Sequence, residues 1–259
     1  MRGLPLLTVV LLTAGWELLV RALDIPHYIL PAPSLVLQTL LENRDSLAAS
    51  WWFTLKITFA GLALATAGGV LIGAVFALSR RIEAALFPIA VILQVTPIVA
   101  IAPLILIYVE STTAALLLCT WVVAFFPILS NTVLGLRAAE IHLHELFTLY
   151  RATRWQRLRL LLIPSALPYF LGGLKISGGL ALIGAVSAEM VAGVAGRETG
   201  LASRILEASY RSETPKMFAA LLLLMVSGIA VFGLFSALSR RLLGRWHASE
   251  REASREGSR

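Results

Sequence analysis

Long runs of apolar residues dominate the pattern of hydrophobic and polar positions along the chain. A membrane-spanning helix needs about 20 mostly apolar residues, because the hydrocarbon core is ~30 Å thick and a helix rises ~1.5 Å per residue. Six stretches reach that length, so the pattern predicts an all-α integral membrane protein with spans at residues 5–23, 54–78, 85–109, 114–136, 167–191 and 217–238. We expect one transmembrane domain over residues 1–259, ending in a charged cytoplasmic tail at 240–259.

The composition supports a membrane protein and excludes other classes. Hydrophobic residues make up 58% of the chain and charged residues 14%, whereas soluble domains are about 25% charged. The single cysteine, Cys119, cannot form an intrachain disulfide. A net charge of +7 would suggest nucleic acid as a partner of a soluble protein, but in so apolar a chain it indicates cations held at the cytoplasmic face. We therefore expect contact with membrane lipid and no nucleic-acid partner.

The distribution of Lys and Arg predicts the orientation of the spans. With the N-terminus inside, the inner segments hold 14 of these cations, and the outer segments with their span ends hold 7. This bias predicts a multi-pass protein with both termini in the cytoplasm. Five of the inner arginines lie between Arg137 and Arg159, in the connection between the fourth and fifth spans.

The third span contains Pro88, Pro97 and Pro103. Proline lacks a backbone N–H and clashes with the carbonyl four residues back, so we expect this helix to be kinked or broken near Thr96 and Pro97. Broken helices within a membrane are tolerated where they line a cavity, which makes Gln94, Thr96 and Pro97 candidates for a translocation path. The alternative for these polar groups is ordinary hydrogen bonding around a kink.

The fifth span carries two ionisable residues, Lys175 and Glu189. They are 14 residues apart, about four helical turns, and therefore share a helix face with Ser177 between them. This stripe of small and polar residues either packs against another helix or lines the path. Thr120 and Asn131 in the fourth span leave the same choice open, so the candidate path residues are Gln94, Thr96, Pro97, Thr120, Asn131, Ser177 and Glu189. Gly69 and Gly73 in the second span form a GxxxG pattern that predicts close helix packing.

Residues 140–162 have the spacing of two short amphipathic helices rather than of a loop. Leu143, Leu146, Phe147 and Tyr150 follow the i, i+3, i+4, i+7 pattern, and leucines after Trp155 continue it. Such helices either lie in the lipid headgroup region with their arginines on anionic lipid, or dock a cytoplasmic partner through exposed aromatic and arginine side chains.

This segment resembles the coupling motif of the permeases of binding-protein-dependent ABC importers, written EAA, three residues, G, nine residues, I, any residue, LP. Glu145 and Pro164 stand nineteen residues apart, as the motif requires, while Leu146 and Phe147 replace its two alanines. Arg151 occupies the position of the motif glycine. A non-glycine residue with positive φ is uncommon, so we expect Arg151 to keep an ordinary helical backbone.

We also expect the turn between the two short helices to be displaced toward Ala152 and Thr153.

The wider resemblance covers nearly the whole chain and is to the nitrate, sulfonate and taurine branch of the family. It includes the Leu30–Ser34 segment, residues 161–189 and Gly200 with Leu201.

The resemblance implies a type I importer permease that forms a homodimer in a bacterial inner membrane. Two cytoplasmic ATPase subunits would grip the coupling helices, and an extracytoplasmic substrate-binding protein would dock around Pro31 and Gly200. ATP binding to the ATPase pair would drive alternating access. The implied coupling residues are Glu145, Leu146, Tyr150, Arg151, Ala152, Thr153, Arg154, Trp155 and Pro164.

The chain has no G-x-x-x-x-G-K-[ST] motif to hold nucleotide phosphates, so ATP and Mg²⁺ are expected on the partner ATPase. We expect no enzyme activity, no catalytic or metal-binding residues and no cofactor on this chain. The alternative function is a self-sufficient secondary transporter or channel that uses Lys175 and Glu189 as a relay. The resemblance implies a small solute, either a nitrogen heterocycle such as a pyrimidine thiamine precursor or an anion such as a sulfonate, taurine or nitrate.

Overall fold

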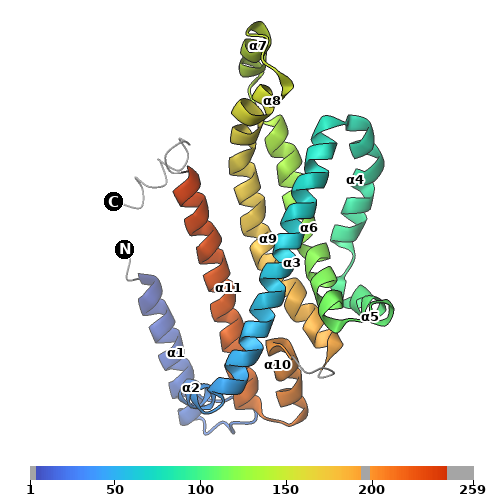
Figure 1. Cartoon of the computed structure of the whole chain (residues 1–259). Helices are drawn as coiled ribbons and strands as arrows, with labels where there is room; N and C mark the ends of the chain where they lie inside the picture. Colours follow the sequence, from blue (N-terminus) through green and yellow to red (C-terminus); the bar gives the residue numbers. More distant parts are fainter. Residues whose placement is uncertain (1–3, 194–198, 244–259) are drawn as a thin grey trace. The chain divides into compact units, whose positions relative to one another are not determined.

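A computed structural model describes residues 4–193 and 199–243, and every regular element in these residues is helical (Figure 1). Residues 244–259, most of the predicted tail, lie outside the described residues. The elements are α1 (Leu4–Ala22), α2 (Pro33–Glu42), α3 (Arg44–Leu78), α4 (Arg80–Val95), α5 (Ile98–Tyr108), α6 (Thr112–Arg137), α7 (Ile141–Leu149), α8 (Arg154–Arg157), a π-helical turn η1 (Leu158–Leu162), α9 (Ile163–Ala192), α10 (Leu201–Tyr210) and α11 (Thr214–Leu243).

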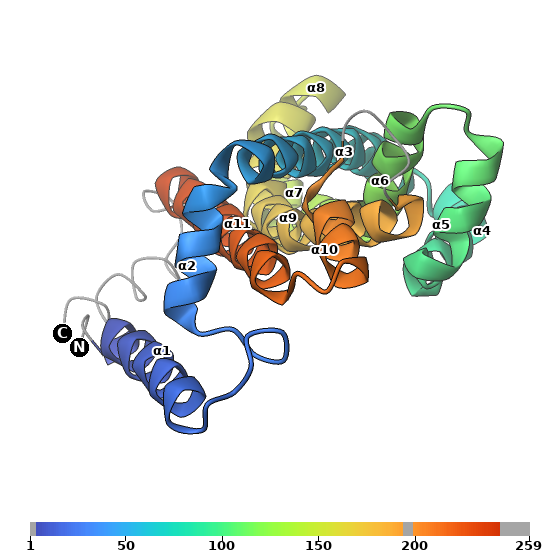
Figure 2. The same ribbon diagram turned by 90° about the horizontal axis from the view of Figure 1, so that it is seen from below.

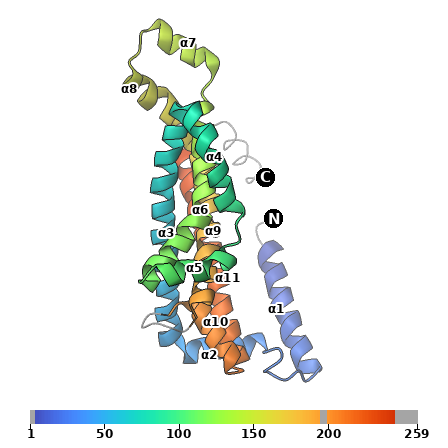
Figure 3. The same cartoon turned by 90° about the vertical axis from the view of Figure 1, so that its right-hand side faces the viewer.

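Four helices in the described part of the chain are long and apolar enough to cross a membrane: α3, α6, the helix from Arg154 to Ala192, and α11. The pair α4 and α5 passes the same test together but is bent by 101°, which gives a fifth candidate (Figure 3). The break falls at Thr96 and Pro97, both with extended backbones, so the predicted break of the third span is confirmed. The helix α1 is not among these candidates, so the predicted span at residues 5–23 stays a prediction.

Two helices lie in segments where the sequence analysis placed no helix. These are α2, between the first two predicted spans, and α10, in the predicted outer connection. In addition, α3 begins at Arg44, ten residues before the predicted start of its span. These segments are too polar or too short to span a membrane, so a search for apolar runs of about 20 residues passes over them. Figure 2 shows α2 between α1 and the start of α3.

The chain divides into two compact units. The first consists of residues 1–56 and 189–227, and its core is formed by Val36, Leu47, Leu201, Ala219 and Ala220. Two hydrogen bonds tie distant segments of this unit together. The indole Nε1 of Trp51 donates to Ser227 Oγ at 2.6 Å, and Thr214 Oγ1 donates to the carbonyl of Tyr28 at 2.8 Å.

The second unit consists of residues 57–188 and 228–259, and α6 lies at its centre. Helix α3 approaches α6 closely because Gly69 and Gly73 have no side chains. A Cβ at Gly69 would lie 2.8 Å from Ile128 Cγ2, and one at Gly73 would lie 2.9 Å from Thr132 Cβ. The close packing predicted from the GxxxG pattern is therefore confirmed. On another side of α6, a Cβ at Gly135 would lie 2.8 Å from the Cα of Ala166 in α9.

An arginine at the end of α6 joins three helices of the second unit. Arg137 donates through Nη1 and Nη2 to the two carboxylate oxygens of Glu83 in α4, at 3.0 and 2.7 Å. Its Nη2 also donates to the carbonyl of Phe76 in α3 at 3.0 Å. A guanidinium matches a carboxylate with two parallel bonds and keeps further donors for the carbonyl. The end of α6 at this point leads directly into α7 and α8 (Figure 1).

Candidate functional site

The helices α7 and α8 form a hairpin at one end of the second unit (Figures 1 and 3). Helix α7 ends in a Schellman motif: the N–H of Ala152 donates to the carbonyl of Phe147 at 2.9 Å, and that of Arg151 to Thr148 at 3.0 Å. Arg151 stands at the left-handed position of this motif with a φ of 49°. The expectation that Arg151 keeps a helical backbone is therefore wrong. The reason is that these two bonds satisfy the last carbonyls of α7 only if this residue turns left-handed.

Helix α8 begins with a capping box immediately after this turn. Thr153 Oγ1 accepts from the N–H of Gln156 at 3.2 Å, and the Gln156 side chain accepts from the N–H of Thr153 at 2.8 Å. Arg157 Nη2 donates to Thr148 Oγ1 in α7 at 3.0 Å, which ties the two helices together. The hairpin is thus fixed by its own local bonds, and the predicted pair of short helices is confirmed.

The second arm of the hairpin continues into α9 without a loop. At η1, the N–H of Ile163 donates to the carbonyl of Leu158, five residues back, and Pro164 follows directly. Pro164 has no N–H for the carbonyl of Leu160, and in an α-helix its ring would press on that carbonyl. A π-turn next to the proline accommodates this without breaking the helix. The last residue of the coupling motif therefore lies within a continuous helix.

The hairpin exposes a mixed apolar and basic surface. Tyr150 and Trp155 are 77% and 66% exposed, and the other implied coupling residues are exposed except Ala152, which is half-buried. Large apolar side chains in such positions, interspersed with arginines, are typical of binding surfaces. The structure brings the implied coupling residues from Glu145 to Trp155 onto this one hairpin.

The carboxylate of Glu189 is buried in the first unit, 1% exposed, at the N-terminus of α10. Its Oε2 accepts hydrogen bonds from Thr54 Oγ1 and from the N–H of Ala202, both at 3.1 Å. Thr54 Oγ1 in turn accepts from the N–H of Leu201 at 2.9 Å. Among the described residues, Oε1 has no hydrogen-bond partner. Glu189 and Thr54 therefore satisfy two of the free N–H groups at the start of α10, where a negative charge is favourable.

The residue before α10 is glycine because of this carboxylate. Gly200 has a φ of −81°, which any residue adopts, so its backbone does not require glycine. A Cβ at Gly200 would instead collide with Cδ and both carboxylate oxygens of Glu189. Glu189, Thr54 and Gly200 at the start of α10 form a capping cage, which was not predicted because these residues come together only through the fold. The available signals were an acid, Glu189, within a predicted span and the pair Gly200–Leu201 in the connection that follows this span.

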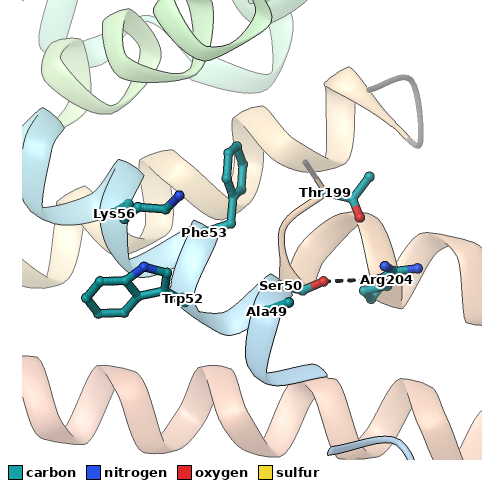
Figure 4. A pocket seen from close by; sticks show the side chains of 7 residues that line it. All are labelled: Ala49, Ser50, Trp52, Phe53, Lys56, Thr199 and Arg204. Atoms are coloured by element: carbon teal, nitrogen blue, oxygen red, sulfur yellow. Dashed lines mark hydrogen bonds between the residues drawn. The ribbon is translucent and has the colours of Figure 1, made fainter. Parts of the chain in front are cut away.

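A cavity of about 280 Å³ lies beside this cage in the first unit (Figure 4). Its polar wall contains Ser50 and Lys56 from α3, Thr199, and Arg204 from α10. Arg204 Nε donates to the buried Ser50 Oγ at 3.1 Å, and its Nη1 donates to Glu207 at 2.8 Å. The lining residues thus include two cationic side chains, Lys56 and Arg204, and two hydroxyl groups, which suit an acidic group.

Glu207 in α10 bonds the cavity-lining Arg204 and a second arginine, Arg211. It bonds Arg204 through Oε2 and Arg211 through Oε1 at 2.9 Å. The hydrogen bond from Arg204, together with the neighbouring positive charges, holds the pKa of Glu207 below its ordinary value. The carboxylate is therefore ionised at neutral pH and fixes the orientation of Arg204 toward the cavity.

The predicted path residues are in different environments. Gln94 and Pro97 are exposed and Thr96 is half-buried at the break between α4 and α5. Ser177 is buried and donates to the carbonyl of Ala124 in α6 at 2.7 Å. Thr120 is buried and donates to Leu116 O at 2.8 Å, whereas the half-buried Asn131 donates to Pro127 O at 2.8 Å.

Residues 69–244 match the family of binding-protein-dependent transport system inner membrane components. This chain belongs to that family. It is a multi-pass permease of the inner membrane and not an enzyme. A permease of this kind works with a separate ATPase and a separate substrate-binding protein.

The permease is similar over nearly its whole length to several named relatives. It is 35% identical to the riboflavin transport system permease protein RibX of Chloroflexus aurantiacus, over 95% of this chain and 91% of the relative. It is 32% identical to the formylaminopyrimidine transport permease protein ThiX of Halalkalibacterium halodurans, over 92% and 94%. It is 28% identical to the putative aliphatic sulfonates transport permease protein SsuC of Bacillus subtilis, over 96% and 88%.

A solved structure shares the fold of this permease. It is a crystal structure of an amino acid ABC transporter with histidines, with a TM-score of 0.62. The alignment covers 79% of this chain and 97% of the other at 19% identity. At that identity the likeness concerns the fold alone.

Proposed function

We propose that this permease is the membrane subunit of a type I ABC importer with six spans and both termini in the cytoplasm. Helix α1 has 19 residues and a length of about 28 Å, which matches a hydrocarbon core of ~30 Å. The bent pair α4 and α5 would act as one broken span, as is tolerated next to a cavity. With α1 and this pair counted, the spans number six. Two permease subunits would form a homodimer around the path.

The α7–α8 hairpin would be the docking element for the cytoplasmic ATPase, which carries ATP and Mg²⁺. The observation that carries this proposal is the rigid construction of the hairpin, closed by the Schellman motif and the capping box and tied by Arg157 to Thr148. A docking element that is ordered before its partner binds loses less conformational entropy on binding. The exposed Tyr150 and Trp155 would supply apolar contact, as aromatic side chains do at interface centres.

The substrate-binding protein would dock on the first unit. The segments around Pro31 and Gly200, named from the resemblance, both belong to this unit. The cavity with Lys56 and Arg204 offers a place for an acidic side chain of the binding protein. Trp52 on the rim of this cavity is 61% exposed and would add an aromatic contact.

For the translocation path, we propose the break around Gln94, Thr96 and Pro97, with Asn131 as a further polar contact. The environments of Thr120, Ser177 and Glu189 support the packing alternative for these three, because their polar groups are engaged inside the described chain. A buried acid that caps a helix is also poorly placed to relay ions. These contacts make the alternative of a self-sufficient transporter with a Lys175 and Glu189 relay the weaker one.

The transported solute is proposed to be a small nitrogen heterocycle. Two relatives at 32–35% identity are named for riboflavin and formylaminopyrimidine transport, and both solutes are nitrogen heterocycles. A sulfonate or a nitrate-like anion is the alternative, since relatives at 28% identity are named for those solutes. Thermal shift of the cognate binding protein with each solute decides the class, because a bound ligand stabilises the folded state by mass action.

Reconstitution into liposomes tests the whole proposal. We expect solute uptake only when the permease, the ATPase with ATP, and the loaded binding protein are all present. Uptake by the permease alone, driven by an ion gradient, would show that it is a self-sufficient transporter.

Two matched tryptophan variants separate the docking surfaces in the same complex. Trp155→Ala should weaken capture of the ATPase and leave binding-protein affinity unchanged, and Trp52→Ala should do the reverse. The two side chains are exposed to a similar degree, 66% and 61%, so general damage would affect both assays alike. Loss of both interactions in either variant would contradict the assignment of two separate surfaces.

A further inference from the structure

We propose that Arg151 pairs with a carboxylate on the ATPase subunit, and that the hairpin retains a strained backbone at this residue for that contact. This inference rests on the proposed docking of the ATPase on α7 and α8. It adds the residue that selects the partner and the chemistry that this residue recognises. The starting observation is the left-handed backbone of an exposed arginine at the tip of the hairpin.

The backbone at Arg151 is unfavourable for an arginine. The left-handed residue at the end of a helix is usually glycine and sometimes asparagine, because a Cβ crowds the following carbonyl in this conformation. Both bonds of the Schellman motif depend on this geometry, so the conformation cannot relax without freeing the end of α7. Glycine or asparagine at this position would form the same turn with less strain. The arginine therefore gives the turn no conformational advantage.

The guanidinium of Arg151 is not used within the described part of the chain. No hydrogen bond or ion pair of this side chain is found among the described residues, and the side chain is exposed. Its neighbour Arg157, by contrast, bonds Thr148 and serves the hairpin itself. Strained residues that perform no local task tend to occur where a binding or switching contact needs them.

The charge of the hairpin indicates which chemistry Arg151 meets. Residues 140–162 contain four arginines and two glutamates, and Glu145 lies 3.8 Å from His142 on α7, away from the turn. The tip, with Arg151 and Arg154 between Tyr150 and Trp155, is therefore positive and partly apolar. A partner surface that covers this tip needs an acidic residue opposite Arg151. An ATPase with a basic or neutral residue there would bind less well, which makes Arg151 a determinant of partner choice.

Four substitutions separate the charge of Arg151 from its backbone strain. Arg151→Gly and Arg151→Asn relieve the strain and remove the charge, Arg151→Ala removes the charge alone, and Arg151→Lys keeps both. In the isolated permease, hydrogen exchange of the amides at 150–152 should slow by roughly threefold to tenfold in the Gly and Asn variants. In the complex, ATPase affinity should fall roughly tenfold in the Gly, Asn and Ala variants and stay within about threefold in the Lys variant.

The decisive signature is that the Gly and Asn variants have a more stable turn and yet bind the ATPase more weakly. The loss should also shrink at high ionic strength, because an exposed ion pair is screened over ~10 Å at ~0.1 M salt. A structural role for Arg151 would move stability and binding in the same direction.

A chemical cross-link tests the carboxylate directly. The chain has no lysine between residues 57 and 174, so wild-type permease offers no amine on the hairpin. A water-soluble carbodiimide joins a lysine amine to a carboxylate in direct contact, with loss of water to the reagent. We expect the Arg151→Lys variant to form a cross-link to an Asp or Glu of the ATPase that wild-type permease does not form.

The outcomes are distinct for this inference and for the proposed function. If the Gly and Asn variants bind the ATPase as tightly as wild type while Trp155→Ala binds weakly, the hairpin docks the ATPase but Arg151 does not select it. If Trp155→Ala and all four Arg151 variants bind normally, the docking proposal itself fails. If the Lys variant binds as weakly as the Asn variant, the positive charge is not what the ATPase recognises.

Discussion

The capping cage around Glu189 predicts the effect of a substitution at Gly200, whose backbone conformation does not require glycine. In the Gly200→Ala variant, the new Cβ would overlap the carboxylate group, so Glu189 must leave its position. This movement breaks the bonds from Thr54 and from the N–H of Ala202. A hydrogen bond contributes about 0.5–1.5 kcal/mol, and a buried polar group left without its partner costs about 1–3 kcal/mol. We expect the local stability of α10 to fall by about 2–4 kcal/mol.

The same cage predicts that the variant is rescued by removing its neighbour. Glu189→Ala alone should also cost about 2–4 kcal/mol, because it leaves the N–H of Ala202 unpaired in a buried place. In the double variant the new Cβ meets no carboxylate, so Gly200→Ala adds little to the loss from Glu189→Ala. The coupling between the two sites should then be about 2 kcal/mol or more, a roughly 30-fold effect on amide exchange.

Hydrogen exchange of the amides at 204–208, inside α10, measures these changes in detergent or lipid discs. Gly172→Ala is the control, since a Cβ there meets nothing within 4 Å. Losses that add within ~0.5 kcal/mol in the double variant would refute the reasoning, because they would mean that Gly200 and Glu189 act independently.

Three further predictions concern packing, pH and an ion pair. Gly69→Ala should destabilise the second unit by about 1–3 kcal/mol in thermal unfolding, because the new Cβ would overlap α6. Gly179→Ala should stabilise it by about 0.5–1 kcal/mol, because a Cβ at Gly179 meets no other atom within 4 Å. Equal effects of the two substitutions would contradict the close packing at Gly69. The pKa of Glu207 is lowered in the folded state, so its stabilising contribution should be complete above the ordinary value of 4.5 and be lost as pH falls through the lowered value. Glu207→Gln should remove this component from the pH dependence of amide hydrogen exchange in α10. An unchanged pH profile in this variant would contradict the role given to Glu207. Arg137→Lys should lower the melting temperature more than Arg159→Lys, because lysine cannot bond both oxygens of Glu83 and the Phe76 carbonyl together; equal melting temperatures would refute this role.

The sequence predicted those features that depend on long or local patterns. Apolar runs of about 20 residues located α3, α6, α9 and α11, and the proline spacing located the break at Thr96 and Pro97. The spacing of Leu143, Leu146 and Tyr150 located the first helix of the α7–α8 hairpin. Each of these signals lies within a single segment of the chain, where the spacing of residues in the sequence determines their relative positions on the helix.

The partner residues in contacts between distant segments were not predicted. The role of Glu189 required the start of α10 and the side chain of Thr54, more than 130 residues away, to be placed beside it. Arg151 was predicted wrongly for a different reason. The general rule against positive φ was applied to the residue alone, whereas the free carbonyls at the end of α7 favour the Schellman turn strongly enough to override it.

The unbroken backbone from α8 through η1 into α9 bears on how force would pass through the permease. A flexible loop between a docking site and a span would transmit movement poorly, but the 39 residues from Arg154 to Ala192 form one helix. If the ATPase docks as proposed, a movement that it imposes near Trp155 would therefore pass directly into the membrane-spanning helix. The π-turn at Leu158–Leu162 is the one irregular turn in the backbone of this helix before Pro168, and it is the place where the helix can bend.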